Sequence, residues 1–212
     1  MATRFAYFLS AILHPLLMPT LLFGILLLQT PTVVGLDVFS ISLRASLLVL
    51  LFIGTFAAPT LIIYYLFRSG YVRNLYLDQL ADRRLPYFLT ALIYTFVGYL
   101  FAYRMQIIST LSPEIPILLG SITVSILLVA LISLYWQISA HGVGIGGVLG
   151  SIAALALKFS LSELFLPTII LVVLAGLVAS ARLKLNAHTP AEVGAGLLLG
   201  LTVSIAAVFW LV

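Results

Sequence analysis

The segment at 181–192 gathers charged and titratable side chains in a chain that is otherwise strongly apolar. It reads Ala-Arg-Leu-Lys-Leu-Asn-Ala-His-Thr-Pro-Ala-Glu, so five residues separate Arg182 from His188 and three separate His188 from Glu192. A second histidine, His141, stands upstream, just before a run of glycines. Ionisable groups are costly near a bilayer and usually serve a function there. A guanidinium, two imidazoles and a carboxylate together indicate phosphate chemistry at a membrane surface.

Two further polar clusters accompany this segment. One spans 78–86 and reads Asp-Gln-Leu-Ala-Asp-Arg-Arg-Leu-Pro, and the other is Ser139-Ala140-His141-Gly142. The three clusters resemble the signature of the type-2 phosphatidic acid phosphatase superfamily, which is Lys-x6-Arg-Pro, then Pro-Ser-Gly-His, then Ser-Arg-x5-His-x3-Asp. The resemblance is carried by these motifs alone, because apolar spans add little specificity.

The third motif matches best. Arg182 and His188 stand at the required spacing, with alanine in place of the serine and Glu192 in place of the aspartate. In the second motif Ser139 and His141 match, whereas isoleucine and alanine replace the proline and the glycine.

The first motif departs most from the family. Arg84-Leu85-Pro86 has one residue between the arginine and the proline, and Leu77 stands where the family has lysine. Arg73 and Arg83 are both candidates to supply the missing charge. Two predicted spans also separate this motif from the second.

The resemblance implies hydrolysis of a lipid phosphate through a covalent phosphohistidine. His188 would attack phosphorus, Glu192 would accept the other ring proton and fix the reactive tautomer, and His141 would protonate the leaving oxygen. The residues expected to bind the phosphoryl oxygens are Arg182, Arg84, Ser139 and Arg83. Because such fixed donors stabilise the charge on a transferring phosphoryl group, the mechanism requires neither a metal nor a cofactor.

Some of these residues also have a structural interpretation. Thr189 and Pro190 form a good helix start, and Glu192 would close a capping box with Thr189, a role that is compatible with catalysis. The glycines repeated within 142–150 and 196–200 indicate close helix packing in a membrane.

The composition bounds the fold class. The 212 residues are 63% hydrophobic and 8% charged, with a mean hydropathy of +1.27, well outside the range of soluble domains. Cysteine is absent, which excludes disulfides and thiolate chemistry, and a net charge of +4 without a basic stripe argues against nucleic acid as a partner. We expect an integral membrane protein of the bacterial inner (cytoplasmic) membrane, with a lipid phosphate as its substrate.

A spanning helix needs about 20 apolar residues, and the sequence predicts an all-α, polytopic bundle of about seven spans. These form a single domain, 1–212, with spans at 5–28, 43–67, 86–104, 115–138, 141–158, 164–182 and 190–212. The uncharged run from Ile115 to Leu157 would be about twice the hydrocarbon thickness as one helix, so it must turn between Gln137 and Gly147. His14-Pro15 predicts a kink in the first span and a structural role for His14.

With this number of spans, all candidate residues share one face of the membrane. The N-terminus, the loop 68–85, the turn 138–142 and the loop 182–190 lie on that side. It carries Arg4, Arg68, Arg73, Arg83, Arg84, Arg182 and Lys184, and the other side carries Arg44, Arg104 and Lys158. The positive-inside rule favours a cytoplasmic site, whereas the resemblance implies an outward-facing site for many members, so the orientation stays open.

Two other functions fit parts of the sequence. Asp78-x3-Asp82 resembles half of the metal–diphosphate site of intramembrane prenyltransferases, which hold Mg²⁺ with two acidic clusters. The remaining acids, Asp37, Glu114, Glu163 and Glu192, are scattered. The departures from the family motifs also fit a non-catalytic scaffold or lipid-binding member. Chelator sensitivity separates the metal enzyme from the phosphatase.

Overall fold

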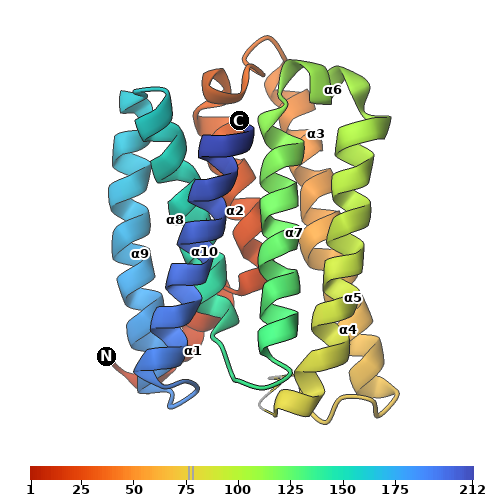
Figure 1. The fold of residues 1–212 in the computed structure, drawn as a ribbon, viewed down its shortest axis with the longest axis vertical. Coiled ribbons are helices and arrows are strands. Elements are labelled where there is room, and N and C mark those ends of the chain that lie inside the picture. The colour runs from red at the N-terminus through yellow and green to blue at the C-terminus, as the bar shows by residue number, and fades with distance from the viewer. Residues whose placement is uncertain (76, 78) are drawn as a thin grey trace.

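The computed structural model describes residues 1–75, 77 and 79–212, and the regular elements in this part of the chain are helices. Seven helical segments of the described residues are long and apolar enough to cross a membrane, which confirms the predicted all-α polytopic bundle. They are Thr3–Gln29, Ile41–Arg68, Leu80–Arg104, Glu114–Ile132, Ala140–Lys158, Ser162–Lys184 and Pro190–Leu211. The segments stand side by side in one bundle (Figure 1).

Some spans are built from more than one helix. The α-helices are α1 (Thr3–Ile12), α2 (Met18–Gly24), α3 (Ile41–Phe52), α4 (Ala58–Arg68), α5 (Leu80–Tyr99), α6 (Gln106–Leu111), α7 (Glu114–Ile132), α8 (Ala140–Lys158), α9 (Phe165–Lys184) and α10 (Pro190–Leu211). π-Helical turns extend α2 (Ile25–Gln29), join α3 to α4 (Ile53–Ala57) and extend α5 (Leu100–Arg104). Short 3-10 turns lie at Pro15–Leu17, Pro31–Val34 and Ser162–Leu164.

Two predicted boundaries are wrong. The third span begins at Leu80 rather than at residue 86, so Arg83 and Arg84 lie on α5 and not in a loop. The fourth span ends at Ile132 and the chain turns over 133–139, earlier than the predicted Gln137–Gly147. The reason is local, because the Ser139 hydroxyl accepts the Gly142 N–H at 3.3 Å and starts α8 ahead of the glycines.

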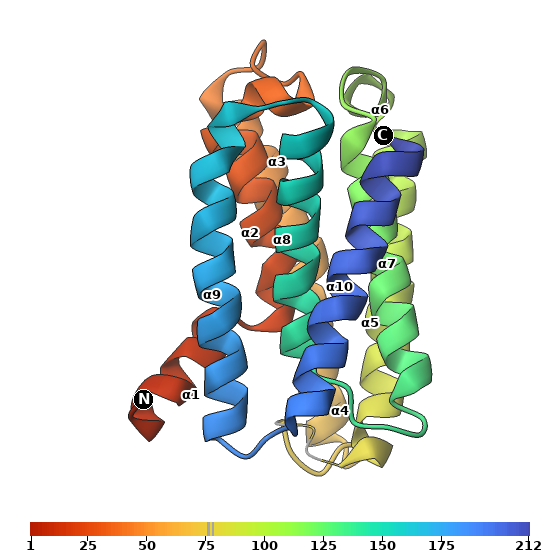
Figure 2. The ribbon, with the colours of Figure 1, turned by 60° about the vertical axis from the view of Figure 1, so that its left-hand side comes forward.

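The first span is broken at His14, as the His-Pro pair predicts. Pro15 has no N–H to continue the helical ladder, and the backbone of His14 is extended, with φ −64° and ψ 138°. Below this break α1 packs against α9 and leans away from α2 (Figure 2). Phe5, Tyr7 and Phe8 on α1 are exposed, as suits an interfacial helix.

Helices α8 and α10 make the closest approach in the bundle. A Cβ on Gly146 would lie 2.5 Å from the Leu197 carbonyl oxygen, and one on Gly200 would collide with the Val143 carbonyl. Only glycine allows this backbone contact, which confirms the packing role predicted for the glycine repeats. Because both helices run in the same direction, their N-termini lie together at one end of the bundle, where α5 also begins (Figure 1).

Candidate functional site

A cavity of about 290 Å³ lies near the end of the bundle where α5, α8 and α10 begin, and all three histidines of the chain line it. They are His14, His141 and His188, joined by Arg83 and Arg182. Among the described residues that line the cavity none is acidic. Its volume is close to the lower end of small-molecule sites, about 300–1,000 Å³. Two guanidinium groups that line one cavity suit an anion as the ligand.

The ends of four helices position these side chains. Arg83 lies in the first turn of α5, His141 is the second residue of α8, and His188 directly precedes the N-cap residue of α10. Arg182 lies in the last turn of α9. Helix N-termini carry unpaired N–H groups and a partial positive charge, so three of the four ends favour a negatively charged ligand.

The His188 ring is fixed through one nitrogen. Its Nδ1 lies 3.1 Å from Glu192 Oε2 and 3.2 Å from the Gln137 carbonyl oxygen. A carbonyl only accepts hydrogen bonds, and so does an ionised carboxylate, so Nδ1 carries the proton. In neutral His188 the lone pair is therefore on Nε2. This is the tautomer that a nucleophilic histidine needs.

Glu192 caps α10 and also contacts the His188 ring. Its Oε2 accepts the Thr189 N–H at 3.0 Å, and the Thr189 hydroxyl accepts the Glu192 N–H at 3.3 Å, which completes the capping box. The same oxygen contacts His188 Nδ1. Because capping fixes the carboxylate, it also fixes the imidazole beside it.

The electrostatic surroundings favour neutral His188. Burial lowers the pKa of His188 below its ordinary value, and the charges of Arg182 and Arg83 lower it further. The hydrogen bond to Glu192 and its negative charge act in the opposite direction without outweighing them. The imidazole lone pair is consequently available at neutral pH.

His141 is held by the broken first span. Its Nε2 lies 3.1 Å from the Ser10 carbonyl oxygen, in the last turn of α1. Carbonyls at a helix end have no intrahelical partner, and the break before Pro15 leaves this one to accept a side chain. Since the carbonyl accepts only, Nε2 carries a proton, and Nδ1 is the nitrogen of His141 that can exchange one.

Arg182 is tied to the same residue of α1. Its guanidinium donates to the Ser10 hydroxyl oxygen at 3.3 Å. Ser10 therefore contacts two of the predicted site residues at once, His141 through its carbonyl and Arg182 through its hydroxyl. The sequence did not indicate Ser10, because no motif connects the first span with residues more than 130 positions away.

The two adjacent arginines of α5 have different surroundings. Arg83 is 5% exposed, lines the cavity and donates to the carbonyls of Leu77 at 2.6 Å and Ile138 at 3.4 Å. Arg84 is exposed, donates to the Leu134 carbonyl at 3.3 Å and is not among the lining residues. Of the two arginines predicted to bind phosphate here, the structure brings Arg83 into the cavity and leaves Arg84 outside.

Ser139 is also outside the cavity. Its side chain is fully buried, and its hydroxyl accepts the Gly142 N–H as the N-cap of α8. Its backbone N–H donates to the Glu192 carbonyl at 3.2 Å, which links the start of α8 to that of α10. Ser139 thus positions the predicted histidines relative to each other, in place of the phosphate contact expected from the motif.

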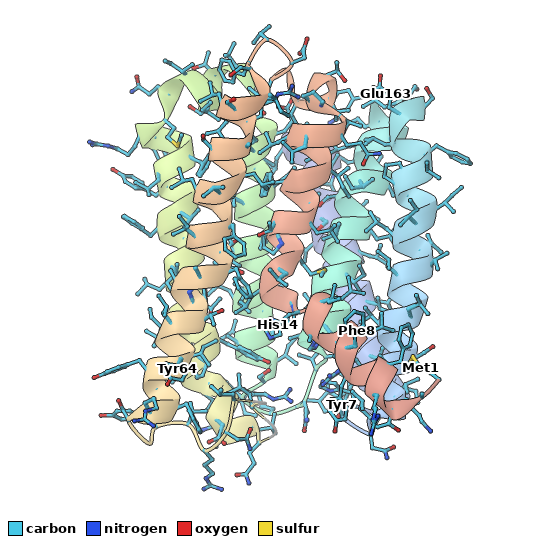
Figure 3. All side chains as sticks on the ribbon, turned by 180° about the vertical axis from the view of Figure 1, so that it is seen from behind. Met1, Tyr7, Phe8, His14, Tyr64 and Glu163 are labelled. Atoms are coloured by element: carbon cyan, nitrogen blue, oxygen red, sulfur yellow. The ribbon has the colours of Figure 1, made fainter. Side chains whose placement is uncertain are left out.

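His14 lines the cavity, which the sequence did not predict. Its ring lies edge-on to His141 with 5.7 Å between ring centroids. Figure 3 shows His14 at the break between α1 and the next helix, with Glu163 at the opposite end of the bundle. The His-Pro pair indicated the kink correctly, but no spacing rule connects residue 14 to the other motifs.

The structure describes one residue of the acidic pair on which the prenyltransferase hypothesis rests. Asp78 lies outside the described residues, and Asp82 is buried on α5. Within the described part of the chain, no group of three histidine, cysteine or acidic side chains has the geometry to hold a metal ion.

A smaller apolar cavity of about 70 Å³ adjoins the larger one. Four residues line both cavities, and they are Pro15, Leu16, Ile126 and Ala140. The smaller cavity continues among Met18, Leu22 and Val148, deeper in the bundle. A ligand with a polar head and an apolar tail fits such a pair of cavities.

Comparisons of the chain with family models, with curated proteins and with solved structures find no match.

Proposed function

We propose that this protein is a membrane lipid phosphatase or phosphotransferase of the kind that the three motifs resemble. It acts on a phosphate monoester or diphosphate of a lipid. The observation that carries the proposal is His188, whose Nδ1–H is held by Glu192 and Gln137 while its ring lines a cavity with two arginines and a second histidine. The arrangement supplies a nucleophile, an acid and an anion-binding pair from one chain.

The reaction follows from the nitrogen assignments. The Nε2 lone pair of His188 attacks phosphorus and the bond from phosphorus to the leaving oxygen breaks. His141, which carries a proton on both ring nitrogens when the phosphate anion is bound, gives the leaving oxygen its Nδ1 proton and becomes neutral. Water then attacks the phosphohistidine, His141 takes the proton of that water, and the phosphorus–nitrogen bond breaks to release phosphate. Arg83 and Arg182 balance the charge on the phosphoryl oxygens throughout.

The apolar surroundings support a lipid as the substrate. The adjoining small cavity accepts the first part of an apolar tail, and the bilayer accommodates the rest. Free sugar phosphates and nucleotides would leave this apolar volume unfilled, and they would gain nothing from a site within a membrane bundle.

Trapping of the covalent intermediate tests the proposal. Wild-type protein turning over a ³²P-labelled lipid phosphate should retain label after rapid denaturation, and the label should be acid-labile and base-stable. His188→Ala should lose both label and phosphate release, while Arg84→Ala, outside the cavity, should retain both. Turnover should persist in EDTA, because guanidinium groups hold the phosphate. A wild-type protein that binds the lipid phosphate without label or release would instead be the non-catalytic member.

A further inference from the structure

His14 has a defined protonation pattern that a helix kink alone does not require. Its Nδ1 accepts the Leu16 N–H at 3.3 Å and so serves as the N-cap of the 3-10 turn Pro15–Leu17. An accepting Nδ1 has no proton, so neutral His14 carries its proton on Nε2. The side chain therefore presents an N–H donor at the ring nitrogen that the turn does not use.

The surroundings of that ring suit an anion. His14 lines the same cavity as Arg83, Arg182 and His188, and its ring meets that of His141 edge-on. A neutral imidazole adds a hydrogen-bond donor to this cavity without adding a further full positive charge, which the guanidinium groups would oppose. A bound phosphate has more acceptor lone pairs than two arginines can occupy, so it can accept a further hydrogen bond.

We propose that His14 is a phosphate-binding residue of this site and donates from Nε2–H to a phosphate-class anion in the cavity. The break in the first span then has a purpose beyond bending the chain. One nitrogen of the His14 ring accepts a hydrogen bond as the helix cap, and the other donates a hydrogen bond to the anion. The 3-10 turn and the ligand therefore contact different nitrogens of the same imidazole. The role of His14 in turnover rests on the proposed function, whereas its role in binding does not.

Two substitutions separate the cap from the anion contact. In His14→Asn the amide oxygen keeps the position of the accepting Nδ1, and asparagine is among the best N-cap residues, but the Nε2–H is lost. His14→Gln keeps an N–H donor at similar reach and weakens the cap. If His14 is purely structural, His14→Asn should resemble wild type more closely than His14→Gln does. If His14 binds the anion, His14→Gln should keep more of the ligand affinity than His14→Asn does.

Binding of inorganic phosphate is measured first, by ¹⁵N NMR of protein labelled at histidine in lipid nanodiscs. The chain contains three histidines, so the spectrum is small and each signal is assigned from a single substitution. Phosphate should shift the Nε2 signal of His14. Losing a hydrogen bond to a charged group should weaken phosphate binding by about ten- to a hundredfold in His14→Asn, with an unchanged thermal midpoint. His14→Gln should bind within a few-fold of wild type.

Lipid phosphate turnover is measured on wild type, His14→Asn and His14→Gln, and also on His188→Ala. If wild type binds phosphate, His14→Asn does not, and wild type shows no turnover, the His14 contact is upheld and the proposed hydrolase activity is overturned. Turnover that depends on His188 but has unchanged KM and phosphate affinity in His14→Asn would overturn the His14 contact alone. A wild-type protein that neither binds phosphate nor turns over lipid phosphate would overturn both.

Discussion

Arg83 and Arg84 are neighbours in sequence and share one side-chain chemistry, yet only the first lines the cavity. We expect Arg83→Ala to lower kcat by about a hundredfold, as for removal of one donor from a charged transition state. Arg84→Ala should stay within a few-fold of wild type. The measurement is phosphate release from a lipid phosphate at saturating substrate. Equal losses of kcat in the two variants would show that the buried position of Arg83 in the cavity does not contribute to turnover.

The pH dependence of turnover should report the environment of His188. Neutral His188 is the proposed nucleophile. Its pKa is lowered by burial and by the nearby arginines, so the acidic limb should lie below pH 6.5. Glu192 opposes this lowering. Glu192→Gln removes its charge but still completes a capping box, so the limb should move to lower pH. A limb that moves to higher pH would contradict the assignment of Nδ1–H to Glu192.

The sequence predicts some site residues better than others, for physical reasons. His188 and Glu192 stand four apart at a helix start, so local geometry alone brings them into contact. The choice between Arg83 and Arg84 depends on where α5 begins, and an error of a few residues in a helix start rotates side chains to another face. His14 and Ser10 meet the other residues only through tertiary packing, which no local pattern encodes.

At the scale of elements, the contact between α8 and α10 holds the two N-termini of the site together. In Gly146→Ala the added Cβ would stand 2.5 Å from the Leu197 carbonyl oxygen, and backbone atoms cannot move aside cheaply. We expect a loss of about 1–3 kcal/mol in the free energy of unfolding, as for other overpacked sites. SDS titration of the purified protein measures it.

Gly176→Ala is the matched control. Gly176 also lies within a spanning helix, α9, but a Cβ there meets no atom within 4 Å. Alanine favours helix by up to about 1 kcal/mol over glycine, so this variant should be as stable as wild type or slightly more so. Similar destabilisation in both variants would mean that helix packing at Gly146 is not the cause.

The sequence predicts that the spans exist, but it does not predict the residues at which they begin and end. Spans follow from runs of apolar residues, because a bilayer core demands them over a fixed length. Their ends are set by single contacts, such as the Ser139 cap of α8 or the absent N–H of Pro15. Hydropathy is insensitive to such contacts, so it misplaced the start of α5 and the turn before α8.

At the scale of the whole molecule, the bundle places four segments of the chain at one end. The N-terminus, the described residues of the loop that joins α4 to α5, the turn 133–139 and the loop 185–189 lie there (Figure 1). The chain has no cysteine, so single cysteines report accessibility without background. In sealed vesicles, a membrane-impermeant maleimide should label Thr3→Cys and Ser69→Cys from the same side and Asp37→Cys from the other. Opposite labelling at positions 3 and 69 would exclude this topology.

The cavity draws its residues from almost the full length of the chain, from His14 in the first span to His188 before the last. His188, the proposed nucleophile, follows six of the spanning segments, and Glu192 is the third residue of the last one. Before the start of α10 forms, the capping box is absent and His188 has no fixed tautomer. On the proposed function, a chain whose last span has not yet folded would therefore be inert toward the phosphorylated lipids around it.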